Sequence, residues 1–178
     1  MFEEVVPTQY ESGWGSINWR YLPKTKEIIW FSERDDWGHL YLYDAATGKV
    51  KNQITKGNWV VTRLVRVDEK NRLLYFMANG SQPENPYFSQ FYKIGFDGKN
   101  LTLLTPGAGT HSVSFSPSEN YFIDTYSKPD VPSVTVLRDM NGKQITELEK
   151  TDVSRLKAAG WKPPTPLILI HQIGRAHV

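Results

Sequence analysis

The densest group of side chains that could do chemistry lies at residues 33–39, where three carboxylates and an imidazole fall close together. If these groups faced one pocket, a carboxylate and His39 could exchange protons with a substrate. The alternative is a hairpin between two strands, with Asp35 and Asp36 shaping the turn and Trp37 covering a sheet edge. We interpret the segment as this hairpin, because its pattern does not pair two carboxylates across one cavity.

Few other residues are candidates for chemistry. The sequence has no cysteine, which excludes a disulfide scaffold, a zinc–thiolate site and a cysteine nucleophile. His111 opens a predicted strand without a second histidine at metal-ligand spacing, and His177 lies near the end of the chain. We therefore expect no metal and no cofactor. We interpret His111 as a hydrogen-bonded structural residue, with a role facing a channel as the alternative.

Two aromatic features could form contact surfaces. Five tryptophans recur along the chain, namely Trp14, Trp19, Trp30, Trp37 and Trp59. They could form a stacking platform for a sugar or a peptide, but their recurrence favours packing within and between sheets. The loop at residues 78–89 is longer than a tight hairpin and carries Tyr87 and Phe88. It could contact a partner or another domain, or pack on itself.

The overall composition excludes several classes of protein. Lys and Arg total 21 against 19 for Asp and Glu, so the net charge of +2 is not the basic footprint of a nucleic-acid binder. No apolar run reaches the roughly 18 residues of a membrane-spanning helix. The first four residues lack the basic and apolar regions of a signal peptide. An aromatic content of 13%, with 13 glycines and 11 prolines, favours a folded, β-rich domain.

One pattern of strands and turns occurs three times in the chain. Each repeat has two strands, a third strand that ends near an aspartate, a Gly-Lys turn and a fourth strand. The Gly-Lys pairs begin at Gly48, Gly98 and Gly142, which are 50 and 44 residues apart. Glycine in such a turn supplies the positive φ that the reversing chain needs. Four antiparallel strands at this period are typical of a β-propeller blade.

The second strand of each repeat is continuously apolar rather than alternating. These strands are at residues 28–31, 73–76 and 121–123. Their pattern predicts burial on both faces, as where four-stranded sheets stack on one another. We predict an all-β fold, a β-propeller fragment of about three four-stranded antiparallel blades. The predicted blades are residues 14–56, 57–106 and 107–150. A β-sandwich with coincidental spacing is the alternative. Because a ring needs about four to eight blades, we expect a larger propeller.

The segment after the last repeat differs from the blades. Residues 151–160 predict a short helix that Asp152 caps and Gly160 ends. Residues 161–166 predict a stiff, extended linker toward a further domain. The last six residues, 173–178, look like the translation of a sequencing-library adaptor. We exclude them, and the six residues before them, from arguments about the fold.

Several segments, taken in their order along the chain, carry a resemblance to a known family. They are residues 12–19 (SGWGSINW), 29–44 (IWFSERDDWGHLYLYD), 53–59 (QITKGNW), 75–80 (YFMANG), 103–106 (LLTP) and 112–118 (SVSFSPS). Together they resemble the N-terminal propeller of dipeptidyl peptidase IV-like enzymes, in the prolyl oligopeptidase family of serine peptidases. The bacterial members are the most similar. The resemblance covers residues 12–166.

The resemblance implies an eight-bladed propeller that precedes an α/β-hydrolase domain. These three blades would then be the C-terminal part of the propeller, and residues 151–166 would lead into the missing hydrolase domain of the same parent chain. The parent enzyme would release N-terminal dipeptides with a penultimate Pro or Ala. It would be periplasmic or secreted and could form a homodimer. This chain would be a non-catalytic segment that shapes and gates the cavity for the peptide substrate.

The resemblance places the catalytic residues outside this sequence. The family's Ser, Asp and His triad belongs to the hydrolase domain, and no Gly-x-Ser-x-Gly nucleophile elbow occurs here. The family's paired glutamates, which hold the substrate's amino terminus, come from an earlier blade. The adjacent pair Glu3 and Glu4 lacks the surrounding context, so we do not assign it that role. We expect no catalytic, cofactor-binding or metal-binding residue, and no peptidase activity from this chain.

Two alternatives come from other functional classes. A stand-alone binding propeller would have no enzyme attached, but the predicted linker and the order of the matched segments argue against it. A glycosidase-type propeller would use Glu33, Asp35 or Asp36, and the sequence does not show the pairing of carboxylates that such chemistry needs.

Overall fold

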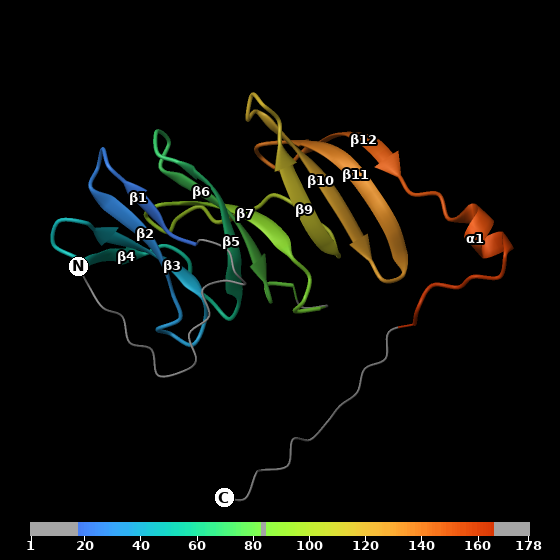
Figure 1. Ribbon diagram of the computed structural model, residues 1–178, viewed down its shortest axis with the longest axis horizontal. Coiled ribbons are helices and arrows are strands. Elements are labelled where there is room, and N and C mark those ends of the chain that lie inside the picture. The colour runs from blue at the N-terminus through green and yellow to red at the C-terminus, as the bar shows by residue number, and fades with distance from the viewer. Residues whose placement is uncertain (1–17, 83–84, 166–178) are drawn as a thin grey trace, which may run out of the picture.

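The structure is a computed structural model that describes residues 18–82 and 85–165 of the 178-residue chain. In this part it has twelve β-strands and one short helix, and the strands form three four-stranded antiparallel sheets. The sheets follow one another along the long axis of the molecule, and the helix lies beyond the last sheet (Figure 1). The prediction of an all-β propeller fragment with three blades is confirmed.

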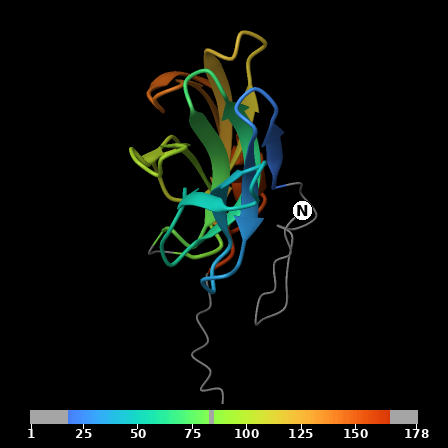
Figure 2. The ribbon, with the colours of Figure 1, turned by 90° about the vertical axis from the view of Figure 1, so that its left-hand side faces the viewer.

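Each sheet consists of four strands that are consecutive in the chain. The first sheet contains β1 (Arg20–Leu22), β2 (Glu27–Ser32), β3 (His39–Asp44) and β4 (Val50–Gln53). The second contains β5 (Val60–Asp68), β6 (Leu73–Asn79), β7 (Gln90–Gly95) and β8 (Thr102–Leu103). The third contains β9 (Thr110–Phe115), β10 (Tyr121–Lys128), β11 (Val131–Asp139) and β12 (Gln144–Lys150). From the side, the sheets lie one behind another (Figure 2).

The Gly-Lys turns connect the third and fourth strands of each sheet, as predicted. Gly48, Gly98 and Gly142 have φ angles of 69°, 76° and 84°, in the left-handed region that glycine enters without a Cβ penalty. In the third turn, Asp139 Oδ1 accepts a hydrogen bond from the backbone N–H of Lys143 at 3.0 Å. The strand limits lie within the predicted blades, while the outer limits of the blades stay a prediction.

Two apolar layers hold the three sheets together. The layer between the first and second sheets includes Ile29, Leu42, Leu74 and Phe76, which are all buried. The layer between the second and third sheets is built mainly of Tyr75, Phe91, Leu104 and Phe122. Because each large apolar side chain contributes roughly 1.5–3 kcal/mol when it is fully buried, these layers stabilise the stack.

The prediction that every second strand is buried on both faces is correct for β6 and partly correct for β2, in which Ile28 and Trp30 are half-buried and the other residues are buried. In the middle sheet, residues 74–78 of β6 are all buried. In β10 the burial alternates, because Phe122 is buried while Tyr121 and Ile123 are 43% and 40% exposed. The prediction was therefore wrong for β10, and the reason is simple. Within the described residues, each outer sheet packs against a neighbouring sheet on one face only.

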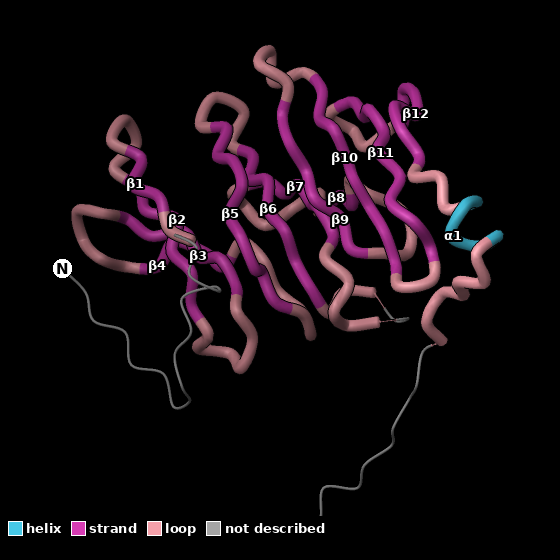
Figure 3. The backbone as a smooth tube through the Cα atoms, turned by 45° about the vertical axis from the view of Figure 1, so that its right-hand side comes forward, coloured by secondary structure: helices cyan, strands magenta, loops and turns pink. Residues whose placement is uncertain are grey.

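The predicted C-terminal helix is present but shorter than expected. It is α1 (Ser154–Ala158), drawn as the single cyan element in Figure 3. Its N-cap position is Val153 instead of Asp152, and Asp152 Oδ1 accepts from the Ser154 amide at 2.8 Å in a turn before the helix. Gly160 follows the last turn with a φ of 91°, so the predicted stop is correct. No helix among the described residues is long and apolar enough to cross a membrane.

Candidate functional site

The acidic segment that begins at Glu33 forms the hairpin between β2 and β3. Asp36 has a φ of 68°, and its backbone N–H donates to the Glu33 carbonyl at 3.1 Å. Asp35 Oδ2 accepts hydrogen bonds from the Tyr41 hydroxyl at 3.1 Å and from the Gln53 amide at 2.8 Å. Asp35 and Asp36 therefore shape the turn and bind their own sheet, which supports the hairpin interpretation.

Arg34 also binds residues of its own sheet. Its guanidinium lies over the Tyr41 ring at 4.3 Å from the centroid, a distance at which a cation and an aromatic face attract. Arg34 Nε donates to Ser32 Oγ at 2.7 Å, and the same guanidinium donates to the Tyr43 hydroxyl. Arg34 therefore stabilises the base of the hairpin.

His39 is the first residue of β3, and its side chain is fully buried. Its Nδ1 lies 3.1 Å from Thr55 Oγ1, and its Nε2 lies 2.9 Å from the Gly57 carbonyl oxygen. Burial lowers the pKa of His39 below its usual value, which favours the neutral ring. Because both ring nitrogens contact protein groups, His39 is a structural residue. The proton-exchange interpretation is wrong for it.

The same contact recurs in the second sheet with a different side chain. Gln90, the first residue of β7, is fully buried, and its Oε1 accepts from Thr105 Oγ1 at 3.0 Å. Its Nε2 donates to the Gly107 carbonyl oxygen at 3.0 Å. Gln90 thus occupies the place that His39 has in the first sheet. Because the Gln90 amide makes the same two hydrogen bonds as the His39 imidazole, this position requires hydrogen bonding and not acid–base chemistry.

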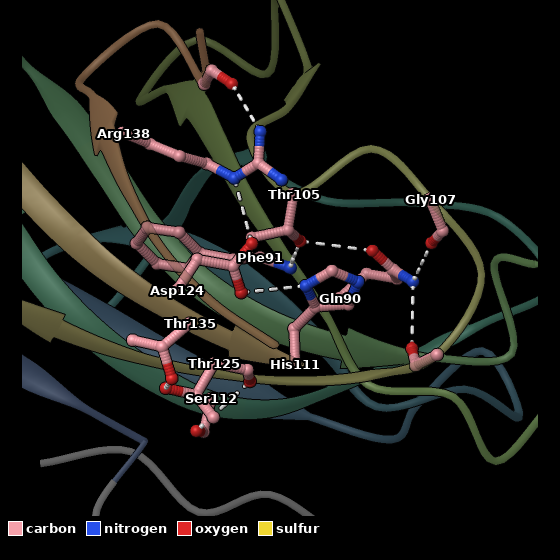
Figure 4. A network of polar contacts seen from close by, with 12 residues as sticks. Gln90, Phe91, Thr105, Gly107, His111, Ser112, Asp124, Thr125, Thr135 and Arg138 are labelled. Atoms are coloured by element: carbon pink, nitrogen blue, oxygen red, sulfur yellow. Dashed lines mark hydrogen bonds and ion pairs between the residues drawn. The ribbon is translucent and has the colours of Figure 1, made fainter. Parts of the chain in front are cut away.

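A second polar cluster is buried in the third sheet and links three neighbouring strands (Figure 4). His111 of β9 has its Nδ1 2.8 Å from Asp124 Oδ1, and Arg138 of β11 donates from Nε to Asp124 Oδ2 at 2.8 Å. Arg138 also donates from its terminal nitrogen to the Gly142 carbonyl at 3.0 Å. The Tyr126 ring stacks on the His111 ring with centroids 5.0 Å apart. The cluster supports the interpretation of His111 as a hydrogen-bonded structural residue.

Sequence reasoning did not identify the partners of His111. Asp124 stands alone as a charged residue in the apolar start of β10, between Ile123 and Thr125. A single acid directly after an apolar run at the start of a strand is a usable signal, because a buried carboxylate needs a partner. The partner, Arg138, lies 14 positions later, and its identity follows only from the pairing of β10 with β11.

A second buried carboxylate, Glu27, joins the first two sheets. The Glu27 side chain of β2 is 3% exposed, and Arg72, from the turn after β5, donates to its Oε2 at 2.8 Å. Lys51 of β4 donates to its Oε1 at 2.5 Å. The hydrogen bond from Arg72, and then that from Lys51, lower the pKa of Glu27 from 4.5 to about 2. The carboxylate is therefore ionised at all but strongly acidic pH.

We expect protonation of Glu27 to make the protein less stable at acidic pH. The folded-state pKa lies below the unfolded value, so the stabilisation is complete above pH 5 and is lost as the pH falls from about 4.5 toward 2. Because Arg72 and Lys51 are nearly half exposed, we expect a loss of about 1–2 kcal/mol by pH 3. Urea unfolding at pH 7 and pH 3 measures it. Between pH 7 and pH 3, the free energy of unfolding should fall less in Glu27→Gln than in the unchanged protein, by about this amount. An equal fall in both proteins would contradict the prediction.

The long loop after β6 has one buried and one exposed aromatic residue. Phe88 is 8% exposed and packs inward, whereas Tyr87 is 81% exposed. The Asn79 side chain donates to the Tyr87 carbonyl at 3.3 Å and holds the two ends of the loop together. Self-packing is thus correct for Phe88, and a contact role for Tyr87 stays a prediction. Residues 83 and 84 lie outside the described part.

The tryptophans also divide between packing and exposure. Trp59 stacks on Phe76 and Tyr92, with centroids 5.9 Å and 6.2 Å apart, so the packing interpretation is confirmed for it. Trp19 and Trp37 are 51% and 39% exposed, so packing between sheets stays a prediction for Trp19, which lies directly before β1 of an outer sheet. Trp37 lies at the surface of its hairpin, in agreement with an edge position.

Several of the predicted candidates lie outside the described residues. They are Glu3, Glu4, Trp14, His177 and the suspected adaptor at residues 173–178. Within residues 18–82 and 85–165, no group of three or more His, Asp or Glu side chains could hold a metal ion.

Comparison with known proteins gives one family and a consistent set of relatives. Residues 3–133 match the family described as the dipeptidyl peptidase IV (DPP IV) N-terminal region. Dipeptidyl peptidase 4 of Arthroderma otae is 36% identical over 103 residues, which are 57% of this chain and 13% of that protein. A probable dipeptidyl peptidase 4 of Aspergillus flavus is 31% identical over 114 residues, 62% of this chain and 14% of that protein.

Solved structures give the same result. The crystal structure of Porphyromonas gingivalis dipeptidyl peptidase 4 matches with a TM-score of 0.62 and 29% identity, over 80% of this chain and 19% of that one. A Bacteroides ovatus protein described as a dipeptidyl aminopeptidase IV matches with a TM-score of 0.57 and 28% identity, over 73% and 20%. The three sheets are consecutive propeller blades, and the chain belongs to the DPP IV N-terminal region family. It spans only 13–20% of the length of these relatives.

Proposed function

We propose that this chain is a non-catalytic propeller segment of a DPP IV-like serine exopeptidase, and that it helps to shape and gate the substrate cavity. The observation that carries the proposal is the match of 80% of this chain to 19% of the Porphyromonas gingivalis peptidase. The parent enzyme would remove N-terminal dipeptides that have Pro or Ala as the penultimate residue. The remaining length would supply the other blades and the hydrolase domain.

The polar clusters support a non-catalytic role. A serine peptidase needs a hydroxyl nucleophile next to the imidazole of an Asp–His pair. His111 and Asp124 form such a pair, but Nε2 of His111 has no hydrogen-bond partner in the described structure. His39 has both ring nitrogens occupied by Thr55 and Gly57. Neither histidine is therefore placed to activate a serine.

Reading the source DNA through and beyond the codon for Gln172 tests this proposal. The expected result is a continuous frame that encodes a Gly-x-Ser-x-Gly elbow, followed by Asp and His in that order. A stop codon soon after the linker, with further blades encoded upstream, would overturn the enzymatic proposal. It would leave a stand-alone binding propeller.

An activity assay tests the assigned role of the segment. The full-length protein should release 4-nitroaniline from an Xaa-Pro anilide, and it should not trim a folded protein with the same N-terminal dipeptide. The present chain alone should release no product. Hydrolysis by the chain alone, or equal rates on the anilide and the folded protein, would contradict the non-catalytic and gating roles respectively.

A further inference from the structure

A groove runs between the first strands of the second and third sheets, β5 and β9. It has a volume of about 290 Å³, near the lower limit for small-molecule pockets. Thr62 and Arg63 of β5, Ser89 before β7, and Thr110, His111 and Ser112 of β9 contribute to its wall. With Met77 of β6, the lining thus contains several hydroxyl groups, one guanidinium, one imidazole and one thioether. No acidic side chain lines it.

The imidazole in this wall lacks one hydrogen bond. His111 is 3% exposed, and its Nδ1 is held by Asp124 Oδ1 at 2.8 Å. Its Nε2 is buried and has no partner in the described structure. A buried polar atom without a partner costs about 1–3 kcal/mol, so such atoms in native proteins need an explanation. An occupant of the groove would supply the missing partner.

The charges around the groove favour an anion. Both oxygens of Asp124 are engaged, one by His111 and one by Arg138 Nε at 2.8 Å, so the Arg138 charge offsets this carboxylate. Arg63 is exposed and forms no ion pair in the described structure. The register of β5 shifts between Val61 and Arg63, which makes a bulge of the kind that changes where side chains point. The uncompensated charge at the groove is therefore positive.

We infer that the groove between β5 and β9 binds a small carboxylate, held by the Arg63 guanidinium and by a hydrogen bond that His111 donates from Nε2. Because the Nδ1–H of His111 already donates to Asp124, both ring nitrogens carry a proton in this complex. The planar fork of an arginine matches the two oxygens of a carboxylate, and one guanidinium balances a single negative charge. The hydroxyls of Thr110 and Ser112 can donate to the same oxygens. Nothing in this site requires the hydrolase domain, so the inference goes beyond the proposed function.

The test uses trifluoroacetate as the probe and the fluorine NMR line width as the readout, with the full-length protein at constant ionic strength. We expect saturable broadening that acetate reverses. Arg63→Gln should weaken binding by about tenfold, because one charged hydrogen bond of about 1.5 kcal/mol or more is lost. Arg20→Gln, which removes an exposed arginine of β1 in the first sheet, is the matched control and should change affinity less than twofold.

The contribution of the ring nitrogen is tested by His111→Asn. The asparagine amide can still donate to Asp124 from the position of Nδ1, but it has no group at the position of Nε2. Binding should weaken about tenfold, while the thermal midpoint shows whether the variant is folded. If His111→Asn does not fold, the comparison of Arg63→Gln with Arg20→Gln tests the inference by itself. Equal binding by Arg63→Gln and Arg20→Gln, unchanged binding by folded His111→Asn, or displacement by phosphate at lower concentration than acetate would overturn the inference.

The source of the carboxylate is distinguished by a peptide pair. N-acetyl-trialanine and N-acetyl-trialanine amide differ only in the C-terminal group, and their blocked amino terminus prevents cleavage by a dipeptidyl peptidase. Competition by N-acetyl-trialanine that exceeds that by acetate would identify a peptide terminus as the ligand, and equal competition would identify a free small acid. Both results support a carboxylate site. Equal competition by the amide would contradict it.

Discussion

Alanine at position 142 is expected to lower the free energy of unfolding by about 3 kcal/mol. Gly142 has a φ of 84°, which strains any residue with a Cβ. A Cβ added there would also lie 2.6 Å from the Leu104 carbonyl oxygen and 2.9 Å from Leu104 Cα. Leu104 is fully buried, and its N–H donates to the Phe91 carbonyl at 2.8 Å, so its backbone cannot move away easily. The Gly-Lys turn of the third blade therefore packs directly on the second.

Two other glycines turn this expectation into a graded test. A Cβ at Gly98 would lie 3.1 Å from the backbone oxygens of Gln53 and Ile54, a milder conflict at the seam between the first two blades. At Gly160 the φ is 91° but no atom lies within 4 Å, so alanine there meets only the backbone strain of about 1 kcal/mol. Urea unfolding of the full-length protein, followed by tryptophan fluorescence, should rank Gly142→Ala as most harmful and Gly160→Ala as least. A loss at Gly142 no greater than that at Gly160 would contradict the packing argument.

The turns could be predicted from the sequence because their chemistry is local. Gly98 follows Asp97, Gly142 follows Asn141, and each glycine precedes a lysine. This pattern specifies a chain reversal wherever it stands. What these glycines touch is not local. The contact of Gly142 with Leu104 joins residues of two different blades, and it exists only after the sheets have stacked. The order of the strands could thus be predicted from the sequence, whereas the contacts between neighbouring blades could not.

The histidine at position 39 shows what side-chain types alone leave open. In an acidic segment it allowed proton transfer as an alternative to the hairpin, but the equivalent residue of the next blade is Gln90, and both bind a threonine and a glycine carbonyl. The usable signal was the Thr-x-Gly sequence that follows the last strand of the first two blades, at Thr55 and Thr105. The threonine and the glycine of this sequence are the constant hydrogen-bond partners of a side chain that differs between the two blades. A comparison between repeats would have identified His39 as a structural residue.

The largest electrostatic effect is expected from Asp124→Asn. Asp124 is fully buried and lies between His111 and Arg138, whose side chain is only 6% exposed. Asparagine keeps the shape and one accepting oxygen but removes the negative charge, so Arg138 becomes a buried cation without a counter-ion. Removing one partner of a buried pair costs about 3–5 kcal/mol, because the remaining charge has lost its solvent as well as its partner. Urea unfolding of the full-length protein should show a loss of this size.

A surface pair and a double variant separate this effect from a general loss of charge. Glu119 pairs with Arg66 at 2.6 Å but is 54% exposed, so Glu119→Gln should cost less than about 1 kcal/mol. Combining Asp124→Asn with Arg138→Met removes the stranded cation and leaves an apolar side chain of similar length. We expect the double variant to be more stable than Asp124→Asn alone, because a buried ion pair can be replaced by apolar groups at little cost. Strictly additive losses would mean that Asp124 and Arg138 are not energetically coupled, and that Asp124 stabilises the third blade mainly through His111.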